Sequence, residues 1–322
     1  MAVGTLNTSL SRKPIHFYGL LLIITAFVLL YRLEWDHEPV LPGTSHHIHH
    51  HKHENKQHAP VQVLSDDYIY QSTWGASPIV VESHKLIFFW VTKAGCTTFK
   101  TLFRRMMGYK DWKTNLNVHY PKTNGLAYLN QYTLNEATAM MSSPDYTRAM
   151  IVRDPKERFL SAYLDKAVAR NGSFVVLACC HKNKQCRSQI QTFQGFFDLT
   201  QNCHNPHWNP QGHRIGPKFV PTLDFVGRMG NITSDARALL EKIGAWEQYG
   251  KTGWGPHGNE SIFASRNGLS ASHRTSDSTF DSWTNLLPKY YREELEAAVE
   301  ARFNIDYATP EFGLTRRKIV FS

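Results

Sequence analysis

Two short strings in the sequence carry residue types that suit the binding of phosphate groups. The first is residues 91–100 (VTKAGCTTFK), which lies between an apolar run and a helical pattern. The first N–H groups of a helix lack partners inside the helix, and the helix dipole adds partial positive charge there. Lys93 adds a full charge, and Gly95 lets the backbone approach a ligand closely. The string therefore predicts an anion-binding loop formed by Lys93, Ala94, Gly95, Cys96, Thr97 and Thr98.

This first string differs from the Walker A phosphate loop. In that motif, G-x-x-x-x-G-K-[ST], the lysine follows the second glycine. Here Lys93 precedes Gly95. Taken alone, the string also fits an ordinary helix N-terminus with a surface lysine.

The second string is residues 151–163 (IVRDPKERFLSAY), which begins at the end of another apolar run. Arg153 then falls at the carboxyl end of a predicted strand, where open α/β sheets bind ligands. Ser161 comes eight residues later, about two helical turns into the next helix. The fork of Arg153 and the hydroxyl of Ser161 could together hold one phosphate group. Arg158 fits either a part of this site or a solvated arginine.

The pattern around these strings predicts the elements that position them. Buried strands are expected at 85–91 and 149–152, and helices at 99–108, 134–141, 155–167, 234–243 and 291–303. Asp154 is the expected N-cap of the third helix, with Pro155 at its first position. Residues 174–221 are interpreted as a disulfide-tied loop region. Strands that alternate with helices predict the α/β class, with a P-loop-like three-layer fold around a central, mainly parallel sheet.

Together the two strings resemble the PAPS-binding motifs of sulfotransferases, where PAPS is 3′-phosphoadenosine 5′-phosphosulfate. The closer similarity is to the Golgi carbohydrate sulfotransferase family, which includes the chondroitin, dermatan and HNK-1 enzymes. It covers roughly residues 85–315. Further matching strings are Leu129-Asn-Gln-Tyr132, Asp165-Lys166, His207-Trp-x-Pro210, Asp224-Phe-Val-Gly227, Phe303-x-x-Asp-Tyr307 and Phe312-Gly313.

The resemblance implies a chemistry and a role for each site residue. PAPS would be the co-substrate, a glycan hydroxyl the acceptor, and no metal would be needed. Lys93 and residues 94–98 would hold the 5′-phosphosulfate, while Arg153 and Ser161 would hold the 3′-phosphate. His119 is the first candidate for the general base, since imidazole accepts a proton near neutral pH. The runner-up is His207, which could instead contact the acceptor beside Trp208, whose ring could stack on a sugar.

The chain departs from the family pattern at four places, one of which is the absence of the usual C-x-x-C-like spacing beyond the His207-Trp-x-Pro210 string. Thr92 stands where the family usually has proline, Phe99 where it has tryptophan, and Met229 and Gly230 where it has a glutamate. Two other hypotheses are an inactive glycan-binding protein on the same fold and another lumenal nucleotide-dependent transferase. A kinase would need a Walker A loop or a kinase signature, and the sequence has neither. Nucleic acid is not an expected partner, because the basic residues are dispersed.

The first part of the chain predicts a membrane anchor. Residues 15–31 are almost wholly apolar, which is just long enough to span a bilayer. Arg12 and Lys13 precede this run and acidic residues follow it, so the N-terminus is expected in the cytosol. A cleaved signal peptide is the alternative. The expected organisation is a cytosolic tail (1–14), an anchor (15–31), a histidine-rich stem (32–65) and a lumenal domain (66–322), placed in the Golgi by the resemblance.

The cysteines fit an oxidising lumen. Four of the five cluster, at Cys179, Cys180, Cys186 and Cys203. They can pair in several ways, with the adjacent pair expected to find different partners. The alternative is a zinc site with neighbouring histidines. Sequons occur at Asn171, Asn231 and Asn259, and the formal net charge of +9 indicates anionic partners.

Overall fold

The computed structural model describes residues 60–71, 77–180, 186–264 and 283–321. The predicted cytosolic tail, the anchor and most of the stem lie outside these residues. Within the described ranges, no helix is both long enough and apolar enough to cross a bilayer. Ordered contacts begin before residue 66, because the backbone N–H groups of Val61 and Val63 donate to the hydroxyls of Ser142 and Thr138.

A five-stranded sheet lies at the centre, in the order β3-β1-β2-β4-β5. Its neighbours β2, β4 and β5 are parallel, whereas β1 runs antiparallel to both β2 and β3. The sheet is thus mixed and mostly parallel, which confirms the α/β prediction. The strands are β1 (Ile79–Val81), β2 (Leu86–Phe89), β3 (Ala127–Tyr128), β4 (Thr147–Val152) and β5 (Phe225–Arg228). The strands β1, β3 and β5 were not predicted, because two to four residues are too short to show a period.

The register of the sheet brings three strand ends to one edge. Phe89 pairs with Met150, and Val152 pairs with Arg228. The carboxyl ends of parallel strands meet at the same edge, where open α/β sheets bind ligands. The loops that follow β2 and β4 therefore leave the sheet side by side.

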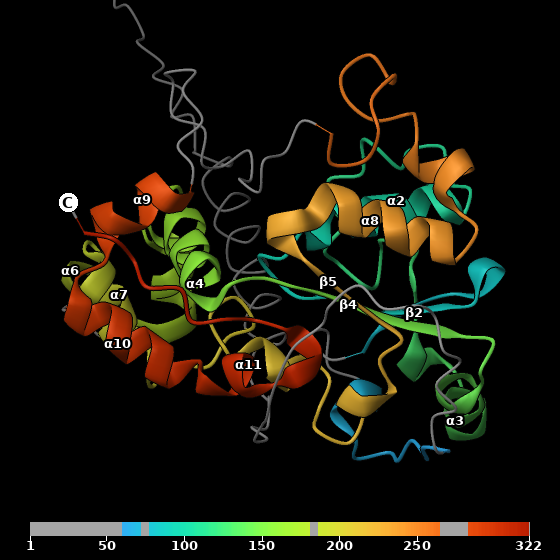
Figure 1. Ribbon diagram of the computed structural model, residues 1–322, viewed down its shortest axis with the longest axis horizontal. Helices are drawn as coiled ribbons and strands as arrows, with labels where there is room; N and C mark the ends of the chain where they lie inside the picture. The colour runs from blue at the N-terminus through green and yellow to red at the C-terminus, as the bar shows by residue number, and fades with distance from the viewer. Residues whose placement is uncertain (1–59, 72–76, 181–185, 265–282, 322) are drawn as a thin grey trace, which may run out of the picture. The chain divides into compact units, whose positions relative to one another are not determined.

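Helices cover both sides of this sheet. Figure 1 shows α2 (Cys96–Met106) and α8 (Ile232–Lys242) next to each other on one side, with α3 (Leu134–Ser142) and α11 (Asn304–Ala308) on the other. The helix after β4 is α4 (Pro155–Tyr163), which packs against α7, α9 and α10. The remaining helices are α5 (Ser173–Val175), α6 (Cys186–Gln189), α7 (Phe193–Thr200), α9 (Trp283–Tyr290) and α10 (Glu293–Arg302).

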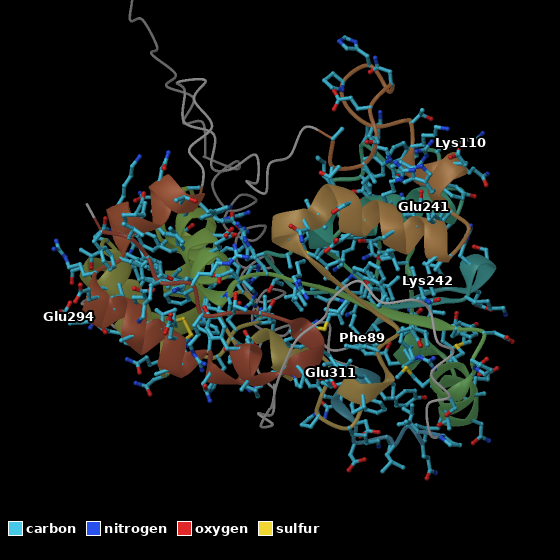
Figure 2. The ribbon with its side chains drawn as sticks, in the orientation of Figure 1. Phe89, Lys110, Glu241, Lys242, Glu294 and Glu311 are labelled. Atoms are coloured by element: carbon cyan, nitrogen blue, oxygen red, sulfur yellow. A yellow bond between two sulfur atoms is a disulfide. The ribbon has the colours of Figure 1, made fainter. Side chains whose placement is uncertain are left out.

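Aromatic side chains form much of the core. Phe159 on α4 contacts the rings of Phe193, Phe196 and Phe303, with centroid distances of 5.4, 5.2 and 5.7 Å. Complete burial of one such side chain stabilises the fold by roughly 1.5–3 kcal/mol. In Figure 2 Phe89 lies within the fold, whereas charged side chains such as Lys110 and Glu294 lie at its periphery. The helix that carries Arg158 and Ser161 is therefore held rigidly.

The start of α4 matches its sequence signature. The Asp154 carboxylate accepts the backbone N–H groups of Lys156 and Glu157, and Pro155 occupies the first helical position. The predicted helix 155–167 has the right extent, but from Leu164 to Val168 it widens into a π-helical turn. Such turns occur frequently at functional sites. This one carries Asp165 and Lys166.

The cysteine-rich region is more helical than predicted. It contains α7, whose Phe193, Phe196, Phe197 and Thr200 form a buried face. The interpretation of 174–221 as a loop region is therefore wrong in this part, because the surrounding Cys, His and Asn residues obscured a short helical pattern. Disulfides join Cys179 to Cys203 and Cys180 to Cys186, so the adjacent cysteines have different partners, as expected. Oxidised sulfurs cannot serve as thiolate ligands, and the zinc alternative is wrong.

Candidate active site

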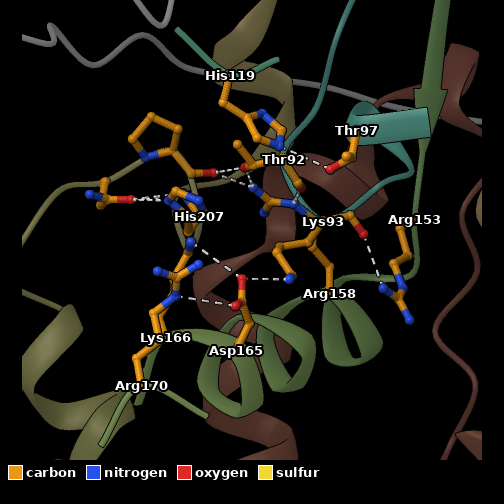
Figure 3. Close-up of polar contacts among 12 residues, drawn as sticks. Thr92, Lys93, Thr97, His119, Arg153, Arg158, Asp165, Lys166, Arg170 and His207 are labelled. Atoms are coloured by element: carbon orange, nitrogen blue, oxygen red, sulfur yellow. Dashed lines mark hydrogen bonds and ion pairs between the residues drawn. The ribbon is translucent and has the colours of Figure 1, made fainter. Parts of the chain in front are cut away.

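The two predicted phosphate-binding segments contact each other. We call them corners: one is residues 91–98, which connect β2 to α2, and the other is residues 152–155, which connect β4 to α4. Arg153 Nη1 donates to the carbonyl oxygen of Lys93 over 3.0 Å, as Figure 3 shows. Arg153 is almost fully buried, and its guanidinium carbon lies 4.4 Å from the centroid of the Trp283 ring. The Arg153 guanidinium and the N-terminus of α2 thus lie close together at the edge of the sheet.

The loop after β2 has the backbone of a tight anion-binding turn. Lys93 and Gly95 both have positive φ, at 65° and 75°. A side chain at Gly95 would be strained, and its Cβ would touch Phe263 and the sulfur of Met229 at 3.4 and 3.5 Å. Gly95 caps α2, so Cys96, Thr97 and Thr98 form its first turn, whose N–H groups have no intrahelical partners. The predicted placement of residues 94–98 at a helix N-terminus is confirmed.

Arg158 is a buried structural residue, or strut, that links three backbone segments. Its guanidinium donates to the carbonyl oxygens of Thr92 (3.0 Å), Pro206 (2.7 Å) and Asn209 (2.6 Å). The solvated alternative is wrong, because the side chain has no exposed surface. Burial lowers the pKa of Arg158 to about 10, so it stays charged at neutral pH. Arg158 therefore ties the loop after β2 to the segment that carries His207.

We expect Arg158→Met to lower the free energy of unfolding by about 3–5 kcal/mol, because three buried carbonyl groups lose a charged donor. Denaturant unfolding of the purified domain measures this loss. Arg237→Met is the matched control, since Arg237 is 59% exposed, pairs with Glu241 and lies 5.2 Å from the centroid of the Trp246 ring without bonding a buried carbonyl group in the contacts described. An Arg158 variant as stable as this control would contradict the strut assignment.

Asp165 gathers three cations below the loop. Its carboxylate lies 2.9 Å from Lys93 Nζ, 3.3 Å from Lys166 Nζ and 3.6 Å from Arg170 Nε. Burial raises the pKa of Asp165, but the positive charges outweigh it and hold the pKa well below the ordinary value. Burial lowers the pKa of Lys93, and that of Lys166 to about 8, even though Asp165 opposes both shifts. The group carries net positive charge, which suits an anionic ligand.

The two candidate bases lie beside this cationic group. His119 Nε2 is 3.0 Å from the hydroxyl oxygen of Thr97, and His207 Nδ1 is 2.7 Å from Asn205 Oδ1. Burial, followed by the charges of Lys100, Lys166 and Lys93, lowers the pKa of His119 to about 3. Burial and the charges of Lys166 and Lys93 likewise lower the pKa of His207. Both imidazoles are therefore neutral at pH 7. Figure 3 shows them beside Lys93.

Two predicted contact residues lie deep in the fold. Ser161 has no exposed surface on α4, on the same helix as Arg158. Trp208 is also fully buried, and its indole N–H donates to the carbonyl of Cys203 over 2.6 Å. Its ring meets Phe196 edge to face at 5.5 Å. Stacking of Trp208 on a sugar is therefore contradicted, because the ring has no face open to solvent.

The structure adds residues to which no role was given from the sequence. Asp165 and Lys166 belonged to a matching string, but their pairing with Lys93 depends on the π-helical turn. Gln211, which bonds the backbone of Arg153, had no signal beyond its place one residue after the His207-Trp-x-Pro210 string. Among the residues that the structure describes, no cluster of three or more His, Cys, Asp or Glu side chains could hold a metal ion.

Comparison with known proteins agrees with this site. A model described as the sulfotransferase family matches residues 78–307. Carbohydrate sulfotransferase 9 of Homo sapiens is 27% identical over an alignment of 184 residues, which covers 52% of this chain and 40% of that protein. Carbohydrate sulfotransferase 11 of Mus musculus is 32% identical over 193 residues, 52% of each chain. Carbohydrate sulfotransferase 14 of Danio rerio is 25% identical over 197 residues, 54% of this chain and 53% of that protein.

No solved structure matches the chain. The chain spans about half the length of the curated relatives that it matches. The family model, in contrast, extends over most of the chain and includes both corners, the Asp165 group and the two histidines. On this evidence the chain belongs to the sulfotransferase family.

Proposed function

We propose that this protein transfers a sulfuryl group from PAPS to a carbohydrate hydroxyl by in-line displacement. The proposal is supported above all by the hydrogen bond from Arg153 to the Lys93 carbonyl, because it brings the two predicted phosphate-binding corners together. The names of the relatives support a carbohydrate as the acceptor. A glycosaminoglycan or an N-glycan fits the cationic surroundings of Lys93 and Lys166.

Each group in the site has a role in this reaction. Lys93 stabilises the negative charge that develops on the leaving oxygen, which departs on adenosine 3′,5′-bisphosphate. The first turn of α2 holds the 5′-phosphate, and Arg153 holds the 3′-phosphate. Contact of Ser161 with this phosphate requires the side chains that bury its hydroxyl to move when the nucleotide binds. His119 accepts the proton of the acceptor hydroxyl while the oxygen attacks sulfur. Lys93 leaves Asp165 for the ligand, and Lys166 and Arg170 then remain to balance the carboxylate.

The departures from the family pattern are compatible with activity. The Thr92 hydroxyl donates to the carbonyl of Pro206 and accepts from Arg158. Phe99 packs on Phe88 at 4.8 Å, and Met229 lies against Gly95. These residues serve the packing around the loop, so their exchange leaves the cationic groups in place.

We further propose that the reaction takes place in the lumen of the Golgi, with the chain anchored as a type II membrane protein. Two disulfides in the described region support an oxidising compartment. The apolar run at 15–31 supplies the anchor.

The direct test is incubation of the lumenal domain with radiolabelled PAPS and a panel of desulfated glycans, followed by mapping of the labelled product. We expect transfer to at least one glycan and none from labelled ATP. Binding of adenosine 3′,5′-bisphosphate without transfer to any glycan would favour the inactive glycan-binding alternative. Transfer from ATP would favour a kinase.

We expect His119→Ala to lower kcat about 100- to 10,000-fold, the range for loss of a general base. The dissociation constant of adenosine 3′,5′-bisphosphate should change little, because His119 faces the acceptor side of Thr97 in this scheme. Rapid-quench kinetics and calorimetry measure the two quantities. The same substitution at His207 separates the candidates, and a His119 variant that loses only nucleotide binding would refute the base assignment.

The pH dependence of kcat/KM gives a second test of His119. An ordinary imidazole is about nine-tenths protonated one unit below its pKa of about 6.5. With its pKa at about 3, His119 stays neutral there, so we expect no tenfold loss between pH 7.5 and pH 5.5. Above about pH 8 the rate should fall, because Lys166 loses its charge. An acid limb centred near 6.5 in folded enzyme would contradict this assignment.

Circular dichroism at each pH must accompany these rates. The unfolded chain binds protons on His119 and His207 below about pH 6.5, whereas the folded chain does not. Stability therefore falls as the pH drops through this range. The comparison uses only the pH values at which the protein remains folded.

A further inference from the structure

Gln211 holds the backbone of Arg153 at both of its polar groups. Its Oε1 accepts the Arg153 N–H over 3.0 Å, and its Nε2 donates to the Arg153 carbonyl over 2.6 Å. Gln211 is fully buried and lies 58 residues away in the chain, at the start of the short helix η6 (Gln211–Arg214). The Gln211 amide thus makes the two hydrogen bonds to Arg153 that a neighbouring strand would otherwise make.

This bond pair is needed because β4 ends at Val152. The last ladder pair joins Val152 to Arg228, so Arg153 lies just past the paired part of the strand. Arg153 is 2% exposed, and a buried peptide group without a partner is costly. The Gln211 amide fixes the peptide groups on both sides of the Arg153 Cα, and hence the point from which its side chain leaves.

Gln211 is itself held in place by Asp306. The two carboxylate oxygens of this fully buried residue on α11 accept the backbone N–H groups of Gln211 (3.0 Å) and Gly212 (2.8 Å). Arg158 contributes a favourable charge to Asp306. A chain of contacts therefore runs from α11 through η6 to Arg153.

The side chain of Arg153 depends on this fixed backbone. From there Nη1 reaches the Lys93 carbonyl at 3.0 Å, Nε reaches Glu157 at 3.3 Å, and the guanidinium stacks over Trp283. A guanidinium recognises phosphate through a planar fork, whose strength depends on orientation. A displacement of about 1 Å in such a group costs up to about a hundredfold in rate.

We infer that Gln211, held by Asp306, is the positioning residue that aims Arg153 at the 3′-phosphate of the donor. The inference rests on the proposed function, since it assigns Arg153 to that phosphate. Both polar atoms of the Gln211 amide bond the Arg153 backbone, so Gln211 acts through that backbone. Loss of Gln211 should therefore weaken recognition of the 3′-phosphate and spare recognition of the 5′-phosphate.

The test compares two nucleotides that differ only in this group. Calorimetry on the full chain in detergent measures the affinities for adenosine 3′,5′-bisphosphate and adenosine 5′-phosphate. In Gln211→Leu we expect the affinity for the bisphosphate to fall about tenfold or more, as for a lost charged hydrogen bond, while the affinity for the monophosphate stays within about twofold. Gln211→Met should change the same ratio, because its side chain fills a similar volume and cannot hydrogen-bond either polar group of the Arg153 backbone.

Asn124→Leu is the matched control. Asn124 is another fully buried amide, and it donates to the Val118 carbonyl and the Tyr128 hydroxyl and accepts the Leu126 N–H. This variant should lose stability without a change in the ratio of the two affinities. It thus measures the effect of removing a buried amide as such.

The outcomes separate the inference from the proposed function. If the wild-type protein binds both nucleotides equally, the 3′-phosphate site and the proposed function fail. If the wild type prefers the bisphosphate and both Gln211 variants keep that preference, the positioning role is refuted. An equal loss of both affinities in the Gln211 variants also refutes it, because damage is then general.

Discussion

Lys93→Ala is expected to abolish measurable sulfuryl transfer, with a fall in kcat of at least about 100- to 1,000-fold. This is the loss seen when one preorganised group that stabilises transition-state charge is removed. The Lys93 ammonium lies 2.9 Å from Asp165 in a side-chain pair that is 12% and 19% exposed, so it is shielded from water. Steady-state kinetics with labelled PAPS measure the effect.

The fold should survive this change. Asp165 keeps Lys166 at 3.3 Å and Arg170 at 3.6 Å as counter-charges, so the variant leaves no isolated buried carboxylate. Lys110→Ala is the matched control, since Lys110 is exposed at the periphery, as Figure 2 shows. An Lys93 variant with the kcat of the Lys110 variant would remove Lys93 from the mechanism.

Arg153→Ala should likewise abolish transfer, because it removes both the cation for the 3′-phosphate and the bond that joins the two corners. The deletion also leaves Glu157 without its partner at 3.3 Å. Arg153→Lys avoids this problem by keeping the charge and losing the planar fork. For this variant we expect the KM for PAPS to rise roughly tenfold to a hundredfold, the range for a charged hydrogen bond.

Competition by nucleotides locates the defect. Adenosine 3′,5′-bisphosphate should inhibit the Arg153→Lys variant more weakly than the wild type, whereas adenosine 5′-phosphate should inhibit both alike. Arg237→Lys provides the control, since its side chain is 59% exposed on α8. Unchanged inhibition by the bisphosphate would place the 3′-phosphate elsewhere in the molecule.

Both predictions depend on the geometry of strand ends. The local sequence determines that a lysine and an arginine follow β2 and β4, and the register places those ends together. Their contact depends on the backbone at both residues. The left-handed conformation of Lys93 directs its carbonyl oxygen toward Arg153, and Gln211 holds the backbone of Arg153 in place. Each corner alone fits an ordinary helix start, whereas the pair forms a site.

Features that depend on neighbouring residues follow from the sequence alone. The apolar runs before Thr92 and Arg153 became parallel strands, and Asp154 with Pro155 started α4 as predicted. Such features follow from backbone period and capping, which act over a few residues. The two strings likewise predict the sulfotransferase family, which the family model confirms.

Contacts between distant segments depend on the folded arrangement of the chain. It buried Arg158 and Trp208, selected the two disulfide pairs, and gave Lys93 a carboxylate partner on the π-helical turn. It also brought Gln211 to Arg153 across 58 residues. The physical reason is that burial and pairing depend on which surfaces pack together. A periodic sequence pattern predicts a helix or a strand, but it does not predict which other element packs against it.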